Sequence, residues 1–244
     1  PETGSNGDGF RILRTLGHTV DESGGALVPL ALANSPTTRA AGVSVRAKLT
    51  LFQDGAKQRS EVGKVLFTHF GISGPATLNI SRDAGQLLVH GPVTIEIDFC
   101  PADGYEKVNA LLQEIFKTHT NKMVKNALGS LLAAALVPVI LERAEILGDK
   151  MCNSVTRDER MRLMKTLKHF AIEIKELLGL NKAVVTSGGV ALTEIDFKTM
   201  RSLKYANLYL VGDLLNINRP SGGYSLQLCW TSGYVAGGAA ATQA

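Results

Sequence analysis

The sequence predicts an α/β fold in which one domain is interrupted by a β-rich insert and a helical insert. Three observations support this interpretation. Gly-rich turns join apolar strands to helices in residues 1–32 and again in 169–244. Alternating apolar residues fill much of 33–101, and apolar residues three and four positions apart dominate 102–168. Because the two outer regions share these Gly-rich turns and the middle two regions lack them, we expect a discontinuous domain. A succession of independent domains is the alternative.

The first helix is expected in the stretch FRILRTLGHTV of the first region. Phe10, Ile12, Leu13 and Leu16 lie at helical spacing, and Gly17 is a suitable stop.

The second region, 33–101, reads mainly as strands. GVSVRAKLTLF and PVTIEIDF alternate apolar and polar residues, as half-buried strands do. Between them, FTHFGISGPATLNISR contains a helix start, with Ser73 or Gly74 as the cap and Pro75 at the first helical position.

The last two regions differ in their expected elements. Residues 102–168 predict helices, in YEKVNALLQEIF, VKNALGSLLAAALVPVILERA and RDERMRLMKTLK. Residues 169–244 return to the short apolar strands FAIEI, KAVVTSGGV and LYLVGD, and they end in a helix rich in Gly, Ala and Ser.

The most informative motif begins at residue 208. Residues 208–212 read as a buried strand of a parallel sheet, and Asp213 follows at its carboxyl end, where ligands of such sheets bind. A carboxylate there can accept hydrogen bonds from ribityl or ribose hydroxyls; a simple turn or helix-cap aspartate is the alternative. Gly222 and Gly223 then precede a helix, whose bare N-terminal amides suit a phosphate or the N1–C2=O edge of an isoalloxazine.

These residues carry a family resemblance. AVVTSGGVALTEIDFKTMRSLKYANLYLVGDLLNINRPSGGYSLQLCWTSGYVAG resembles the C-terminal signature of bacterial NAD(P)/FAD-dependent oxidoreductases, which include aminoacetone-oxidase-type flavoproteins. PETGSNGDGFRILRTLGHTV and GKVLFTHFGISGPATLNISR resemble two further segments of that family. The resemblance implies a partial FAD-binding Rossmann-like domain, residues 1–32 and 169–244, that carries a β-barrel-like insert, 33–101, and a helical insert, 102–168.

The resemblance also implies a cofactor site. The residues expected to face the flavin and its ribityl-phosphate tail are Gly212, Asp213, Gly222, Gly223, Tyr224, Ser225 and Gln227. A turn near the same crevice is expected from Thr186, Gly188 and Gly189. A loop close by is expected from Thr3, Gly4, Gly7 and Asp8.

Three positions depart from the family pattern. The family usually has Glu where this chain has Asp213, Asp where it has Asn216, and Asn where it has Ser225. The first change shortens the acid, the second removes a charge, and the third replaces an amide by a hydroxyl.

A fourth departure concerns the dinucleotide-binding fingerprint. The chain has no strand followed by GxGxxG and an acidic residue about 20 positions later. The sequence therefore predicts a C-terminal fragment or processed product whose partner is the missing N-terminal βαβ segment of the same protein. We expect the fragment alone to be inactive and to bind FAD weakly.

The predicted function is that of the C-terminal part of an FAD-dependent oxidoreductase. It would transfer a hydride between a small organic substrate or NAD(P)H and the flavin. Two alternatives stay open: a non-catalytic binding or assembly module that retains the scaffold, and a flavin enzyme that acts on RNA. His69 has no acidic neighbour in sequence and Cys229 has no second cysteine, so no catalytic residue is assigned.

The net charge, the apolar runs and the cysteines limit which partners and which cellular location we expect. With 26 basic and 22 acidic residues the net charge is only +4, and no basic run is interleaved with aromatic residues, so we expect no nucleic-acid partner. The apolar run 127–141 contains Pro138 and is shorter than the roughly 20 residues of a membrane helix. Cys100, Cys152 and Cys229 form no CxxC and have no histidine at ligand spacing, which predicts no metal site and reduced thiols in a cytoplasmic setting.

Overall fold

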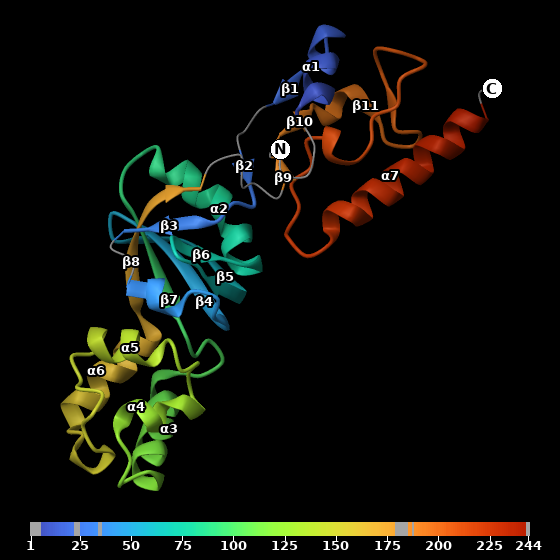
Figure 1. Ribbon diagram of the computed structural model, residues 1–244. Coiled ribbons are helices and arrows are strands. Elements are labelled where there is room, and N and C mark those ends of the chain that lie inside the picture. The colour runs from blue at the N-terminus through green and yellow to red at the C-terminus, as the bar shows by residue number, and fades with distance from the viewer. Residues whose placement is uncertain (1–5, 22–24, 34–35, 179–184, 187, 243–244) are drawn as a thin grey trace. The chain divides into compact units, whose positions relative to one another are not determined.

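The chain forms two compact units. The computed structural model describes residues 6–21, 25–33, 36–178, 185–186 and 188–242. One unit, here called the barrel unit, is Pro29–Leu177; the other, the terminal unit, combines Pro1–Val28 with Leu178–Ala244. Both contain helices and strands (Figure 1), which confirms the mixed α/β class.

A closed barrel forms the centre of the barrel unit. Its strand order is β3-β6-β5-β4-β7-β8, and every neighbouring pair is antiparallel. The strands are β3 (Leu30–Leu32), β4 (Ser44–Gln53), β5 (Ala56–Phe67), β6 (Gly71–Ser73), β7 (Val93–Asp98) and β8 (Phe170–Leu177). In β7, alternation directs one face of the strand inward, and Val93, Ile95 and Ile97 are fully buried. Closure leaves no unpaired edge in this sheet.

The barrel boundaries differ from those expected. Residues 170–177, which the sequence grouped with the flavin-binding part, form β8 and pair with both β3 and β7. Residues 30–32 likewise belong to the barrel rather than to the first region. Pairing partners decide this placement, and local alternation does not reveal them.

Helix α2 (Pro75–Leu88) packs against the barrel, mainly on β5. It begins where the sequence predicted, with Gly74 as the N-cap and Pro75 in the first turn. Proline suits that position because its missing N–H has no helical partner there. The helix buries Ile80 and Ala84 completely.

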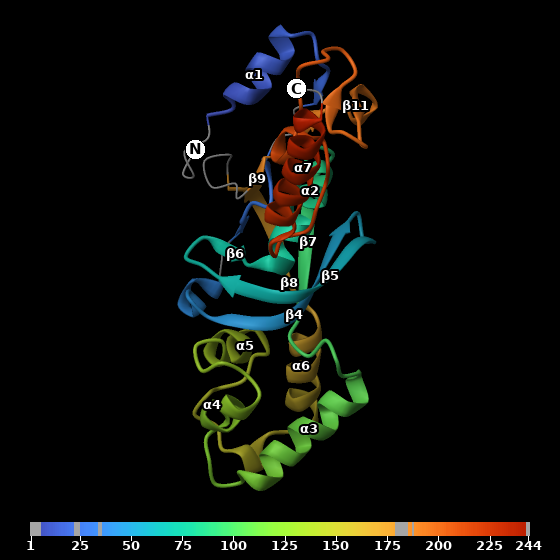
Figure 2. The ribbon, with the colours of Figure 1, turned by 90° about the vertical axis from the view of Figure 1, so that its right-hand side faces the viewer.

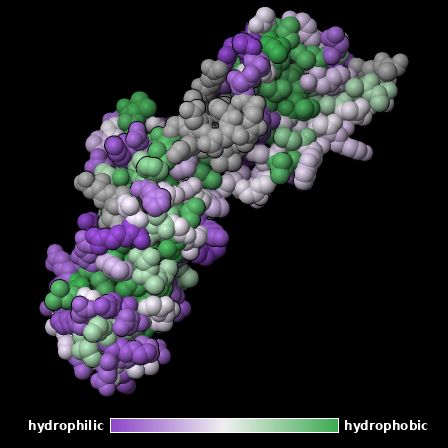
Figure 3. Space-filling model, viewed as in Figure 1, coloured by the Kyte–Doolittle hydropathy of each residue, from purple (hydrophilic) through white to green (hydrophobic). Residues whose placement is uncertain are grey.

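Four helices of the same unit lie between β7 and β8 along the chain. They are α3 (Tyr105–Thr118), α4 (Val124–Ala127), α5 (Val137–Arg143) and α6 (Arg157–Lys168), with 3-10 turns at Pro36–Ala40 (η1), Leu128–Ser130 (η2) and Cys152–Ser154 (η3). Figure 2 shows them below the barrel, and Figure 3 shows their surface as largely hydrophilic. Helix α6 begins with a capping box. The Glu159 amide donates to Thr156 Oγ1 (3.2 Å), and the Thr156 amide donates to Glu159 Oε2 (2.8 Å).

The apolar run 127–141 is not one continuous helix. It is divided among α4, η2 and α5, because Pro138 lacks the N–H that a helix interior needs and fits only the first turn of α5. Among the described residues, no helix is long and apolar enough to cross a membrane.

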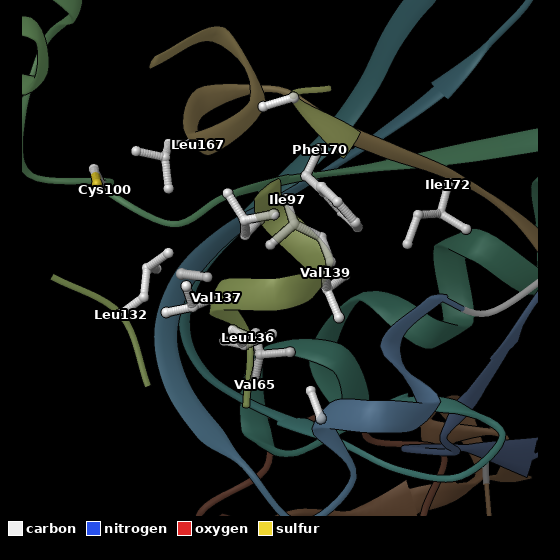
Figure 4. Packing of buried hydrophobic residues seen from close by; sticks show 14 of the residues in the cluster. Val65, Ile97, Cys100, Leu132, Leu136, Val137, Val139, Leu167, Phe170 and Ile172 are labelled. Atoms are coloured by element: carbon white, nitrogen blue, oxygen red, sulfur yellow. The ribbon is translucent and has the colours of Figure 1, made fainter. Parts of the chain in front are cut away.

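One hydrophobic core joins these helices to the barrel. In Figure 4, Val137 and Val139 of α5, and Leu136 just before it, lie in one cluster with Ile97 of β7 and Phe170 of β8. Each of these five side chains is at most 2% exposed. The barrel and the helices therefore share one packed interior.

The terminal unit is built from short elements. They are α1 (Asp8–Thr15), β1 (Val20–Asp21), β2 (Gly25–Ala26), β9 (Val185–Thr186), β10 (Gly189–Val190), η5 (Leu192–Glu194), β11 (Ile195–Asp196), β12 (Arg201–Ser202), η6 (Gly212–Leu214) and α7 (Tyr224–Ala241). The strands pair antiparallel as β1-β10, β2-β9 and β11-β12. Helix α1 ends as predicted: the Gly17 amide donates to Arg14 O and the His18 amide to Leu13 O, which is a Schellman motif.

The predicted parallel strand at 208–212 is wrong as an assignment of secondary structure. Leu210 is fully buried, but Tyr209 makes only an isolated antiparallel bridge to Arg201. A strand needs a partner over several residues, and in the described part of the terminal unit the neighbouring strands are two residues long.

Candidate functional site

The turn η6 and the residues after it contact three segments of the terminal unit: α1, β10 and α7. From α1, Gly9 approaches so closely that an added Cβ would lie 2.7 Å from Leu214 Cδ2. From β10, Gly189 packs on the backbone after the turn, where a Cβ would lie 2.5 Å from the carbonyl carbon of Leu215. A parallel bridge between Val190 and Leu215 fixes this approach. Glycine is therefore required at position 189, where the contacted atoms are backbone, whereas at position 9 the contacted atom ends the flexible Leu214 side chain.

Helix α7 completes the arrangement from the other direction. The Gly212 amide donates to Ser232 Oγ (2.9 Å), whose hydroxyl donates to Leu228 O (2.6 Å). A Cβ on Gly212 would lie 2.7 Å from Cys229 Sγ. The body of α7 is thus tied to the residue just before Asp213.

The N-terminus of α7 is bare. Gly222 and Gly223 have φ values of +104° and +94°, both are exposed, and no heavy atom lies within 4 Å of a Cβ built on either. Gly223 is the N-cap and has no side chain to cover the first-turn amides, which have no partner within a helix. A flat or negatively charged ligand can reach this backbone, and any larger residue would fill the space it needs.

Asp213 is paired with Arg219, a residue that the sequence analysis did not single out. Arg219 Nη2 forms an ion pair with Asp213 Oδ1, and Arg219 Nε donates to Ser225 Oγ (2.9 Å). The Arg219 side chain is 9% exposed and the Asp213 side chain 52%. Burial lowers the pKa of the Arg219 guanidinium from its usual value. The structure therefore brings Asp213 and Ser225 together through a buried cation.

The remaining residues expected on α7 face outward. Tyr224 is 57% exposed, and Gln227 Nε2 donates to Thr231 Oγ1 (3.0 Å). Both lie on the first turns of α7, next to the glycine pair, and neither contacts Asp213 in the described structure.

The other expected residues divide into two groups. Gly7 is the N-cap of α1, and Asp8 forms an ion pair with Arg11 (2.6 Å), so this end of α1 lies one residue from the Gly9 contact. Gly188 is buried and precedes Gly189. Thr186 of β9 pairs through its backbone with Gly25 of β2 and makes none of the η6 contacts described above. Its side chain, and Thr3 and Gly4 entirely, lie outside the described part.

A buried polar network supports α1 from its other end. His18 Nδ1 is 2.6 Å from Glu194 Oε2, and His18 Nε2 is 3.0 Å from Ser202 Oγ. The order Ser-His-Glu is that of acyl-transfer triads. However, Ser202 is 3% exposed and its oxygen accepts the amides of Lys204 and Tyr205, so the network is structural. Sequence spacing could not reveal it, since His18 and Glu194 are 176 residues apart.

Glu194 carries the charge of this network. Lys204 Nζ, 2.8 Å from Glu194 Oε1, contributes most to lowering the pKa of Glu194 from 4.5 to about 2; His18 and the Thr19 amide add to the effect. Because the pKa is lowered on folding, the carboxylate stabilises the fold above pH 4.5, and this stabilisation is lost as the pH falls towards 2.

Replacing Glu194 by Gln is expected to lower the free energy of unfolding by about 3 kcal/mol at neutral pH, since it leaves His18 and Lys204 without their anion. Urea titrations between pH 7 and pH 2.5 measure the change. The wild type should lose stability below pH 4.5 more steeply than the variant. Parallel stability curves would show that Glu194 does not carry the charge.

Known proteins resemble this chain over nearly its whole length. The family described as HI0933-like protein barrel and H2TH domain matches residues 25–185. The chain is 31% identical over 243 residues to a 3-dehydro-bile acid delta(4,6)-reductase of Clostridium scindens, covering 98% of this chain and 58% of the relative.

Two further relatives carry the same printed name. Ribosomal RNA dihydrouridine synthases of Escherichia coli and Haemophilus influenzae are 29% and 28% identical over 240 and 236 residues, each covering 96% of this chain and 56% of the relative. The chain therefore spans rather more than half the length of the curated relatives it matches.

Proposed function

This chain belongs to the HI0933-like family, and we propose that it is the C-terminal part of an FAD-dependent oxidoreductase. The observation that carries the proposal is the meeting of Gly9, Gly189 and the body of α7 around η6, together with the bare N-terminus of the same helix. The reductase relative supports an oxidoreductase-type activity and does not favour a non-catalytic module.

The residues present fit a flavin. Exposed first-turn amides after Gly223 stabilise negative charge, which suits the N1–C2=O edge of an isoalloxazine. Asp213 is half-exposed and can accept hydrogen bonds from ribityl hydroxyls. When bound, FAD supplies the hydride chemistry between NAD(P)H and a substrate, while these residues bind and orient it.

We propose a small organic molecule as the substrate. The Clostridium scindens relative is named for a bile acid, which is such a molecule. A reducing, cytoplasmic location belongs to the same proposal, because Cys100, Cys152 and Cys229 are all free thiols.

RNA is the second candidate substrate, supported by two relatives and by one feature of the barrel. Arg46 of β4 lies directly opposite Lys64 of β5, and both are exposed. Like charges in such a pair are unfavourable unless an anion joins them, and an RNA backbone supplies anions. RNA binding that weakens steeply with salt would favour this candidate over the expected absence of a nucleic-acid partner.

The proposed partner of α7 is the N-terminal βαβ segment of the same protein. None of the 18 residues of α7 is charged, and Leu226, Trp230 and Tyr234 are 57%, 66% and 85% exposed on one face. These residues recur every four positions and so form one apolar stripe. Such a face normally packs against another layer, and the greater length of the relatives supports a further segment.

Protein expressed from the complete coding sequence is expected to purify with one FAD, whose absorption band bleaches on addition of NADPH. Residues 1–244 alone should bind FAD about 100-fold more weakly, a difference of about 2.7 kcal/mol, because the proposed clamp on the ADP half is not included. Equilibrium titration of both proteins with FAD measures this. Tight stoichiometric binding by residues 1–244 would contradict the fragment proposal, and a colourless full-length protein would contradict the flavin.

A further inference from the structure

Two residues of the candidate site meet at one side chain. Asp213 and Ser225 both bind Arg219. Asn216 is not part of this group, because its Nδ2 donates instead to Asp21 (3.3 Å). Asp213, Ser225 and Arg219 therefore form one structural group.

Three interactions hold the guanidinium. Nε donates to Ser225 Oγ (2.9 Å), Nη1 donates to Ile217 O (2.6 Å), and Nη2 pairs with Asp213. Ser225 lies on the first turn of α7, and Ile217 lies on the segment that leads into this helix. These two partners therefore fix Arg219 beside the glycine pair. A planar guanidinium with several fixed donors is suited to binding oxyanions.

The ion pair is asymmetric in burial. The cation is 9% exposed, whereas its carboxylate partner is 52% exposed. Asp213 can turn to water or to a hydroxyl at little cost, but a buried guanidinium left without an anion is strongly unfavourable. A negative group that arrives near Gly222 would thus replace Asp213 as the partner of Arg219.

We propose that Arg219 is the cation of the cofactor site, and that a negative group of the bound flavin takes over its pairing from Asp213. This inference rests on the proposed function. Two parts of the cofactor have the required charge: the N1–C2=O edge of the reduced isoalloxazine and the phosphates. In either case the Asp213 carboxylate becomes free to accept a hydrogen bond from a ribityl hydroxyl.

The test compares Arg219→Gln with wild type in FAD-loaded protein from the complete coding sequence. If Arg219 faces the reduced ring, the variant should bind reduced relative to oxidised flavin about tenfold more weakly, which lowers the two-electron midpoint potential by about 30 mV. If it faces a phosphate, the potential stays unchanged and the affinities for FMN and FAD fall about tenfold relative to riboflavin. Arg219→Lys keeps the charge and should give intermediate values in the same measurement.

Arg201→Gln is the matched control, a charge removal on β12 of the same unit, and should change neither quantity. Should Arg219→Gln fail to fold, the ¹⁵Nε resonance of Arg219 in the wild type must shift during titration with FAD. If the wild type binds flavin normally but Arg219→Gln changes neither the midpoint potential nor the flavin affinities, this inference is overturned and the proposed function is not. An Arg219 ¹⁵Nε resonance that does not shift with FAD has the same meaning. A wild-type protein that binds no flavin contradicts the proposed function itself.

Discussion

Replacing Gly189 by Ala is expected to lower the free energy of unfolding of the terminal unit by about 2–5 kcal/mol. Gly189 has φ +139°, which L-residues rarely adopt, and its Cβ would lie 2.5 Å from the Leu215 carbonyl carbon and 2.6 Å from the Asn216 nitrogen. The strained backbone accounts for about 1–2 kcal/mol. Overpacking accounts for about 1–3 kcal/mol more, since backbone atoms cannot move aside as a flexible side chain can.

Hydrogen exchange during urea unfolding measures this effect separately in each unit. Amides of α1 and η6 should lose protection at lower urea in the variant, while the barrel strands keep theirs, because the barrel has its own core. If the proposed function holds, retention of FAD by the full-length protein falls together with this protection.

Gly17→Ala is the control for backbone strain without a clash. Gly17 also has positive φ, +78°, but no heavy atom lies within 4 Å of an added Cβ. It should lower stability by only about 1 kcal/mol. Equal effects of the two substitutions would mean that the close contact at η6 contributes nothing.

The elements that could be predicted from the sequence are those with local determinants. Helix α2 begins at Pro75 because the proline and the preceding glycine determine its first turn, and α1 ends at the Gly17 motif for an equally local reason. The place of β8 in the barrel could not be predicted. Its partner β3 lies about 140 residues earlier, so pairing depends on closure of the whole sheet.

The candidate site shows the same division. Some of the glycines could be singled out because bare backbone is itself the signal: Gly189 packs on the backbone after η6, and Gly212 in η6 packs on Cys229 of α7. The supporting residues could not. Arg219 carries no motif, and His18 acquires its role only through Glu194, far away in the sequence. Charged and polar networks depend on tertiary proximity, which periodicity does not encode.

Replacing Lys168 by Met is expected to lower the free energy of unfolding of the barrel unit by about 3–5 kcal/mol. Lys168 ends α6, with one residue between it and the start of the barrel strand β8, and its side chain is 10% exposed. Its ammonium donates to Asp98 Oδ2 (2.6 Å), Cys100 O (2.9 Å) and Asp103 O (2.7 Å). Met keeps the apolar stem of the side chain, so the change in stability reports the removal of the ammonium charge alone. The nearly buried Asp98 carboxylate is then left without its cation.

The pair with Asp98 should be separable from the two carbonyl contacts by a double-mutant cycle in urea. Asp98→Asn removes the anion and retains an oxygen to accept the Cys100 amide, which donates to Asp98 Oδ1 (2.8 Å). In the Lys168→Met background this second change should recover part of the lost stability, a coupling of about 1–3 kcal/mol. Additive losses would show that the carbonyls of Cys100 and Asp103, not the ion pair, hold α6 and β8 to the end of β7. Recovery would instead show that unpaired charge, rather than lost packing, makes this junction between barrel and helices sensitive to substitution.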